Sequence, residues 1–179
     1  MSAELSKLLN EIGLKAKTAS EVLNTASSDQ KNKFFDFAVE AIQENLDVIL
    51  AANQIDIEAA KINKKDEAFI DRLALDKDRL QGVCDTLAEI KSFQDPVGRV
   101  LASWERPNGL NISRVSTPLG VIGLIFESRP NVAADAGGLC LKSGNAVILR
   151  SGKDGLKSAT AIVNSLQDAL KRSELPKEC

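Results

Sequence analysis

Basic side chains that could hold an anion stand at two corresponding points of the sequence. Arg129 follows the apolar run Leu119–Phe126, and Arg150 and Lys153 follow a second apolar run. Each run is expected to be a strand that leads into a helix, where free backbone N–H groups and the helix dipole attract anions. Residues 114–153 carry five basic and two acidic side chains, in a chain of formal net charge -2. This pattern predicts an anion site at the strand ends; the alternative is that these side chains are solvated or salt-bridged.

The sequence excludes several other kinds of catalytic site. It contains no histidine, so no Ser-His-Asp or Cys-His mechanism and no His-ligated metal site can form within it. Cys84, Cys140 and Cys179 are isolated and match no zinc or disulfide pattern, so no metal site is expected. We expect Cys84 and Cys140, which stand among helical residues, to be buried and structural. There is no GxGxxG motif and no ATP-type phosphate loop, since Gly120 and Gly123 lie inside the first apolar run.

Composition indicates one globular unit, or a domain and a piece. The chain has 179 residues, of which 44% are hydrophobic and 4% aromatic. The near-neutral charge and the scarcity of aromatic residues argue against nucleic-acid binding. No apolar stretch reaches the ~20 residues of a membrane helix, and the first residues do not resemble a signal peptide. We therefore expect a cytoplasmic protein without a membrane contact.

Residues 1–94 are expected to be helical. Apolar residues recur there at three- and four-residue steps, and Ser27–Asp29 offer an N-cap. The helix that this cap opens is expected to run through Phe34 and on towards Ile62. We expect all the apolar stripes to pack in the core. The first stripe is Leu5, Leu8, Leu9, Ile12, Ala16, Ala19 and Leu23.

Residues 95–117 are expected to form a β-hairpin arm. Two β-type runs, Arg99–Trp104 and Leu110–Ser116, flank the turn-rich segment Arg106–Gly109. Asn-Gly between such runs is a strong hairpin signal. The alternation of apolar and polar residues along the first run predicts a half-exposed arm.

Residues 118–179 are expected to have the order β-α-β-α. The uninterrupted apolar run that ends at Phe126 predicts a strand buried on both faces of a parallel sheet. A helix over Asn131–Lys142, a second strand over Ala146–Leu149 and a last amphipathic helix follow. Two strands do not complete a parallel sheet of this kind. The predicted fold class is therefore α/β with an incomplete sheet, from the N-terminal portion of a longer chain.

Three motifs carry a resemblance to a known family. They are Arg-Val-Ser-Thr-Pro-Leu-Gly-Val-Ile-Gly (114–123), Phe-Glu-Ser-Arg-Pro-Asn-Val (126–132) and Cys-Leu-Lys-Ser-Gly-Asn-Ala-Val-Ile-Leu-Arg (140–150). Together they resemble gamma-glutamyl phosphate reductase, also called glutamate-5-semialdehyde dehydrogenase, of the aldehyde dehydrogenase superfamily. The resemblance extends over the whole chain but covers less than half of a family member. It implies an incomplete Rossmann-type cofactor domain, preceded by N-terminal helices and a β-hairpin oligomerisation arm.

The resemblance also implies a function. The family reduces L-glutamyl 5-phosphate to L-glutamate 5-semialdehyde with NADPH, in proline biosynthesis. A cysteine thiolate attacks the acyl phosphate, and the resulting thioester accepts a hydride. The catalytic domain with that cysteine would follow residue 179, and none of the cysteines here matches its motif, so the chain alone is expected to be inactive. The implied partners are the substrate, further copies of the chain through the hairpin, and the upstream glutamate kinase.

Site residues carry over where the motifs align. The Pro-Trp-Asn-Phe-Pro turn of aldehyde dehydrogenases corresponds to Phe126–Pro130, so Ser128 stands in place of the Asn that stabilises the oxyanion. Asn131 is a second candidate for that role, and a backbone N–H is a third. Arg129 is the candidate contact for a substrate anion. The residues at the end of the first strand that would contact the cofactor are Ile125, Phe126 and Glu127.

Two further residues bear on the choice of cofactor. Arg150 stands in place of the family's Lys at the adenosine ribose, and Lys153 in place of a Glu that contacts ribose hydroxyls in many relatives. A Glu there would repel a 2′-phosphate, whereas Arg150 and Lys153 would attract one. The sequence therefore favours NADP(H) over NAD(H).

Two other interpretations remain open. In the first, the chain is a non-catalytic helical and hairpin assembly module whose charged turns are solvated. In the second, it is the reductase half of a bifunctional kinase–reductase. The start at Met1 with a helix and no preceding kinase domain disfavours the second.

Overall fold

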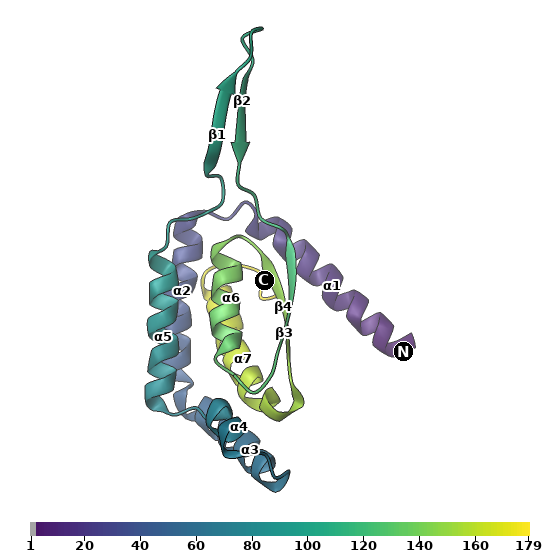
Figure 1. Ribbon diagram of the computed structural model, residues 1–179, viewed down its shortest axis with the longest axis vertical. Coiled ribbons are helices and arrows are strands. Elements are labelled where there is room, and N and C mark those ends of the chain that lie inside the picture. Colours follow the sequence, from purple (N-terminus) through teal and green to yellow (C-terminus); the bar gives the residue numbers. More distant parts are fainter. Residues whose placement is uncertain (1–2) are drawn as a thin grey trace.

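The computed structural model describes residues 3–179, in which helices pack against a small sheet and a hairpin projects from one end (Figure 1). The helices of the first half are α1 (Ala3–Leu23), α2 (Ser28–Glu44), α3 (Leu46–Ile62), α4 (Glu67–Leu73) and α5 (Lys77–Ser92). The hairpin strands are β1 (Val100–Glu105) and β2 (Asn111–Val115). The rest comprises β3 (Val121–Phe126), α6 (Val132–Lys142), β4 (Ala146–Ser151), the 3₁₀-helix η1 (Lys153–Gly155) and α7 (Leu156–Arg172). Within residues 3–179, no helix has the length and apolar character that crossing a membrane requires.

Asn45 divides the long helix that the sequence predicts. The predicted N-cap is confirmed, because the Ser27 hydroxyl accepts a hydrogen bond from the Gln30 N–H at 3.1 Å. The predicted continuation towards Ile62 is wrong: α2 ends at Glu44 and α3 begins at Leu46. Asn45 has φ of -98° and ψ of 13°, outside the helical region. Its side chain donates to the Ala41 carbonyl at 2.8 Å, beside its own backbone N–H at 3.1 Å, and such a local side-chain bond competes with continuation of the helix.

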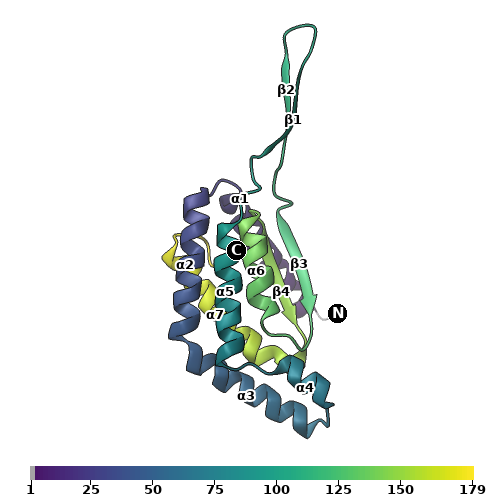
Figure 2. The ribbon, with the colours of Figure 1, turned by 60° about the vertical axis from the view of Figure 1, so that its left-hand side comes forward.

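The core lies between α2, α5, α6 and α7. Phe34 and Phe35 of α2 meet edge to face, with their ring centroids 5.2 Å apart. In α6, a Cβ added at Gly138 would lie 3.0 Å from the Leu87 side chain of α5, so the glycine permits close packing of these two helices. Figure 2 shows α2, α5 and α6 side by side on one face of the sheet.

The expectation that every apolar stripe is buried is wrong for α1. Ala16, Ala19 and Leu23 are buried, but Leu8 is 52% exposed, and Leu5, Leu9 and Ile12 are also exposed. Figure 1 shows why, since α1 runs along the sheet and its first half extends beyond the rest of the body. The apolar stripe of α1 is therefore buried only towards its C-terminal end.

The parallel pair β3–β4 is also more exposed than predicted. The two strands pair in register from Val121 with Ala146 to Phe126 with Ser151. Yet Ile125 is 73% exposed, because no other strand among residues 3–179 pairs with β3 and no helix covers this position. The prediction of a strand buried on both faces is therefore wrong for the described residues. The prediction of a parallel strand is confirmed, but Gly123 and Ile125 are exposed and the other residues of β3 are only half-buried.

The hairpin arm leaves the body at the end where β3 begins (Figure 2). Trp104 of β1 pairs with Ile112 of β2, and the turn is closed by the Gly109 N–H, which donates to the Arg106 carbonyl at 2.9 Å. Gly109 has φ of 80°, a left-handed conformation that glycine adopts without strain. Both strands are largely exposed, so the arm contacts the body only at its base.

A buried charge cluster holds the base of the arm. Lys31 of α2 is 1% exposed, and its Nζ lies 2.5 Å from Asp95 Oδ2 in the segment that leads to β1. Asp95 also accepts hydrogen bonds from the Ser28 hydroxyl and the Val97 N–H, at 2.7 and 3.0 Å. Burial alone would raise the pKa of Asp95, but these hydrogen bonds and the Lys31 charge outweigh it and lower the pKa. The carboxylate thus stays ionised and ties the arm to α2.

Candidate functional site

The turns after β3 and β4 lie side by side, at the end of the sheet opposite the arm. The Gly152 N–H donates to the Phe126 carbonyl at 2.8 Å, which joins the second turn to the end of β3. Ile125 pairs with Arg150 in the sheet register. A Cβ added at Gly152 would lie 3.1 Å from the Glu127 side chain, so the two turns are in contact. The sequence-predicted residues of both turns therefore form one edge.

Ser128 has a strained backbone at this edge. Its φ is 48°, in the left-handed region, although it is not glycine. Such a conformation costs about 1–3 kcal/mol and is found preferentially at functional sites. It reverses the chain between the end of β3 and the Pro130 carbonyl, which accepts the Ala133 N–H at 3.1 Å in the first turn of α6. Ser128 is half-buried and so remains open to a ligand.

Asn131 precedes the first residue of α6, but its side chain does not cap the helix. It is the N-cap residue of α6, yet its side chain accepts no capping hydrogen bond. Instead, its Nδ2 donates to Asp135 Oδ2, one turn later, at 3.0 Å. Burial raises the pKa of Asp135, and the hydrogen bond from Asn131 offsets this only in part. The amide of Asn131 is thus committed to a carboxylate, whereas the Ser128 hydroxyl has no such partner in the described residues.

An apolar groove of about 500 Å³ runs between β4 and α7. We call it the β4–α7 groove; the site residues that line it are Phe126, Arg150 and Ser151. Arg150 is the one of these that brings a positive charge, and it is exposed. The Ser151 Oγ is shielded from solvent and has no hydrogen-bond partner among residues 3–179. An unpaired buried hydroxyl is uncommon and calls for a ligand or water.

Lys153 lies outside this groove, on η1, and is exposed. In the part of the chain that the structure describes, neither Arg150 nor Lys153 forms a salt bridge, whereas the neighbouring Asp154 pairs with Lys65 at 3.2 Å. The N-terminus of α7 is not a free anion site as the sequence suggested. Asp56 of α3 accepts the Ser158 N–H there at 2.8 Å. Any affinity for an anion after β4 thus depends on the Arg150 and Lys153 side chains.

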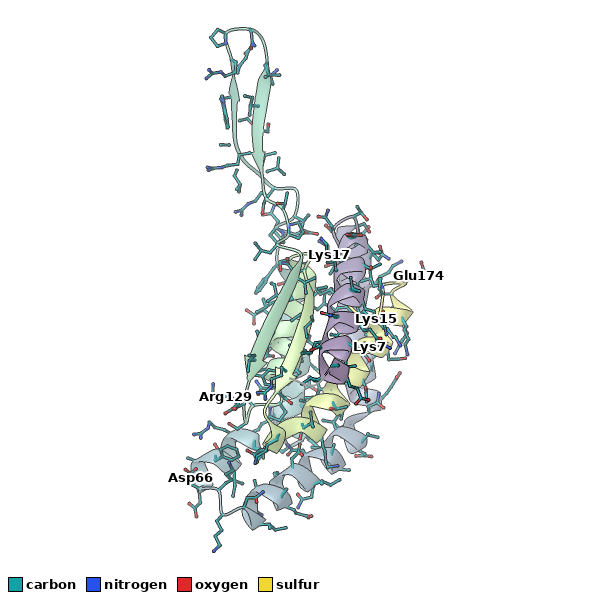
Figure 3. All side chains as sticks on the ribbon, turned by 90° about the vertical axis from the view of Figure 1, so that its right-hand side faces the viewer. Lys7, Lys15, Lys17, Asp66, Arg129 and Glu174 are labelled. Atoms are coloured by element: carbon teal, nitrogen blue, oxygen red, sulfur yellow. The ribbon has the colours of Figure 1, made fainter. Side chains whose placement is uncertain are left out.

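Arg129 belongs to a second pocket, on the other side of the first turn. This pocket has a volume of about 410 Å³ and lies between α4, α5 and the start of α6. We call it the α4–α6 pocket; its polar and charged lining residues are Asp71, Arg72, Arg79, Thr86, Arg129, Asn131 and Asp135. Figure 3 shows Arg129 beyond the end of the sheet, towards α4.

The structure therefore corrects the expectation of a single basic cluster. Lys142 is buried, and its Nζ donates to Asn32 Oδ1 and to the Lys91 carbonyl at 2.8 and 2.7 Å. Arg114 lies on β2 in the arm. Sequence proximity grouped these residues with Arg129 and Arg150, but the fold sends their side chains to separate places. Asp135 and Ser151 were missed; the only available signal was the spacing of Asn131 and Asp135 by one helical turn.

The cysteines are unsuited to nucleophilic chemistry. Cys84 and Cys140 are buried, as predicted, and burial raises the pKa of each thiol; the charge of Asp85 adds to the effect at Cys84. Burial, with a contribution from the Glu178 charge, raises the pKa of Cys179 to about 12. A thiol with a raised pKa carries little thiolate at neutral pH. Residues 3–179 also contain no group of three potential metal ligands.

Comparison with solved structures defines the fold class. A probable aldehyde dehydrogenase from Listeria monocytogenes superposes with a TM-score of 0.68, over 96% of this chain and 35% of that chain, at 14% identity. No protein-family model matches the chain. The chain therefore has part of an aldehyde dehydrogenase-type α/β fold, as the sequence predicts.

Within that class, the chain is similar to gamma-glutamyl phosphate reductase. It is 48% identical to that protein from Brucella suis over 176 residues, which are 98% of this chain and 42% of the relative. The crystal structure of gamma-glutamyl phosphate reductase from Thermotoga maritima superposes with a TM-score of 0.93 at 42% identity, over 95% of this chain and 41% of that chain. The family resemblance in the sequence is confirmed. The chain spans about two fifths of the length of these relatives.

Proposed function

We propose that this chain forms the cofactor-binding part of an NADPH-dependent reductase that converts L-glutamyl 5-phosphate to L-glutamate 5-semialdehyde in proline biosynthesis. One observation carries the proposal: the strained turn at Ser128 touches the turn of Arg150 and Lys153, with a separate pocket on either side. A reductase needs this arrangement, because its cofactor and its substrate must approach one reacting centre from two directions. The similarity to gamma-glutamyl phosphate reductases supports the choice of reaction.

The residues after β4 suit the nucleotide end of NADP(H). Arg150 and Lys153 would attract the 2′-phosphate, since both are exposed cations without an ion-pair partner in the described residues. Ile125, Phe126 and Glu127 would contact the cofactor from the end of β3. The cofactor supplies the hydride when bound.

The turn after β3 suits the reacting carbonyl. The Ser128 hydroxyl, or a backbone N–H of this turn, would stabilise the oxyanion of a tetrahedral intermediate. Asn131 is the less suitable donor because Asp135 already accepts from its amide. Arg129, on the far side of the turn, would hold an anionic group of the substrate.

The nucleophile would come from outside this chain. All three thiols have raised pKa values, so none of them provides the thiolate that attacks an acyl phosphate. The relatives are more than twice as long as this chain, which leaves room for a catalytic cysteine elsewhere in their sequences. On this proposal the 179-residue chain has no reductase activity by itself.

The hairpin arm would serve assembly into a homo-oligomer. Its exposed apolar side chains include Val100, Leu101 and Trp104, and no further strand within residues 3–179 pairs with the outer edge of β1 or of β2. A strand from a second copy could pair with such an edge. Glutamate kinase, which would make the acyl phosphate, is the proposed partner in the pathway.

Cofactor preference tests the proposal. We expect the chain to bind NADPH at least tenfold more tightly than NADH in isothermal titration calorimetry, since the 2′-phosphate adds charge-assisted hydrogen bonds worth about 1.5–3 kcal/mol. Lys153→Glu should abolish this preference, and Lys61→Glu, on the exposed surface of α3, should leave it unchanged. Equal binding of NADH, or an unchanged preference in Lys153→Glu, would contradict the proposal. Binding of neither nucleotide would instead favour the non-catalytic assembly module.

A further inference from the structure

We propose that the α4–α6 pocket recognises the zwitterionic head of a free α-amino acid, with Asp135 binding the ammonium group and Arg129 and Arg72 binding the carboxylate. The inference rests on the proposed function, because it assigns the part of the substrate that lies farthest from the reacting carbonyl. It goes beyond that function by naming an ammonium site.

The charges of this pocket divide into a satisfied pair and an unsatisfied set. Arg79 is committed to α4: its Nη2 lies 2.6 Å from Asp71 Oδ1, and its Nη1 donates to the Ala74 carbonyl at 2.9 Å. Asp135 has no cationic partner among residues 3–179, and its carboxylate accepts only the Asn131 amide. Arg72 and Arg129 form no salt bridge within the same range.

This unsatisfied set matches a zwitterion better than a simple ion. A dicarboxylate without an ammonium group would bring negative charge towards the half-buried Asp135, which repels it. A simple cation would meet Arg72 and Arg129. An α-amino acid pairs both signs at once, so the partial desolvation of Asp135 is offset by the ligand ammonium group. The raised pKa of Asp135 is the behaviour of a carboxylate that lacks such a cation.

Gly82 lines the pocket at a point where α5 has no side chain. It lies in the middle of α5, where glycine is about 1 kcal/mol less favourable than alanine. A Cβ at this position would have no atom within 4 Å, so the glycine is not required by packing inside the protein. Gly82 lines the pocket, and a larger side chain there would enter the space left for a ligand.

The position of the pocket fits a substrate that reacts at the far end of its side chain. Arg129 directly follows Ser128, and Asn131 begins the helix that carries Asp135. An amino-acid head bound at Asp135 would therefore leave its side chain to extend back to the strained turn. A side chain with a terminal carbonyl group would reach the oxyanion candidates at Ser128.

Two probes of nearly equal length test the assignment. L-glutamate carries the ammonium group and glutarate lacks it, and both can be titrated into the ¹⁵N-labelled chain with the amide chemical shifts as readout. We expect L-glutamate to shift the amides of residues 79–86 and 129–135 and to bind about tenfold more tightly than glutarate, as expected for one charge-assisted hydrogen bond. Asp135→Asn should make the two affinities equal.

Two further variants separate binding from folding. Gly82→Leu should abolish binding of both probes while circular dichroism stays unchanged, since the new side chain projects into open space. Asp78→Asn, an exposed carboxylate on the same helix outside the pocket, should retain the preference for L-glutamate. The inference is overturned if wild-type protein binds both probes equally, binds neither, or keeps its preference in Asp135→Asn. NADPH titrations of the same samples report on the cofactor proposal separately, because Arg150 lines the other cavity.

Discussion

Replacing Lys31 with methionine tests how the base of the hairpin arm is held. The change removes the ammonium group 2.5 Å from Asp95 and leaves a carboxylate whose side chain is only 14% exposed. Loss of one partner from a buried ion pair costs about 3–5 kcal/mol. Since Asp95 keeps its hydrogen bonds from Ser28 and Val97, we expect the lower end of that range, about 3 kcal/mol. Urea denaturation followed by circular dichroism at pH 7 would measure it.

Lys91→Met is the matched control. It breaks the Lys91–Asp36 pair at 2.6 Å, whose side chains are 37% and 55% exposed, so the expected loss is below about 1 kcal/mol. The effect at Lys31 should also depend on pH. Because the pKa of Asp95 is lowered in the fold, its contribution is full above the unfolded value of 3.8 and is lost as the pH falls through the folded value. A Lys31→Met loss no larger than that of Lys91→Met, or one that persists undiminished at pH 2, would refute the reasoning.

Three further outcomes follow from the site and the arm. With glutamate 5-semialdehyde, phosphate and NADP, the chain alone should give no turnover, and clear NADPH production by pure protein would count against this. Cys84 and Cys140 should react with a thiol reagent only after unfolding, because burial raises their pKa values. Ser128→Gly should raise the free energy of unfolding by about 1 kcal/mol, since glycine relieves the left-handed strain, and an unchanged midpoint in urea would argue that no strain is stored there. If the arm mediates assembly, Trp104→Ser should shift the chain towards monomer in light scattering, and an unaltered mass distribution would exclude that role for Trp104.

Local patterns were sufficient to predict much of the fold. The hairpin, the order β-α-β-α and the cap at Ser27 follow from turn residues, apolar periodicity and capping chemistry within a few residues of each other. The break at Asn45 is also local, but its signal in the sequence is weak, because it rests on a single residue whose side chain bonds back to the Ala41 carbonyl. The exposure of Leu8 and Ile125 depends on what covers α1 and β3, which periodicity does not reveal.

The sequence predicted that the turns after β3 and β4 meet, but not that Arg129 and Arg150 line two separate pockets. The meeting of the turns at Phe126 and Gly152 follows from parallel pairing, which places the carboxyl ends of strands together. The separation of Arg129 from Arg150 results from the packing of α4 and α5 against α6, and these helices lie far away in the sequence. The same packing places Asp135 beside residues of α4 and α5 in the α4–α6 pocket, so its position in the sequence alone does not predict a functional role.

Hydrogen exchange with and without NADPH tests the central claim most directly. If the ends of β3 and β4 hold the nucleotide, NADPH should slow exchange at the amides of residues 126–129 and 150–153, and Arg150→Glu should remove that protection. Protection confined to other segments, or protection that Arg150→Glu leaves intact, would contradict the account.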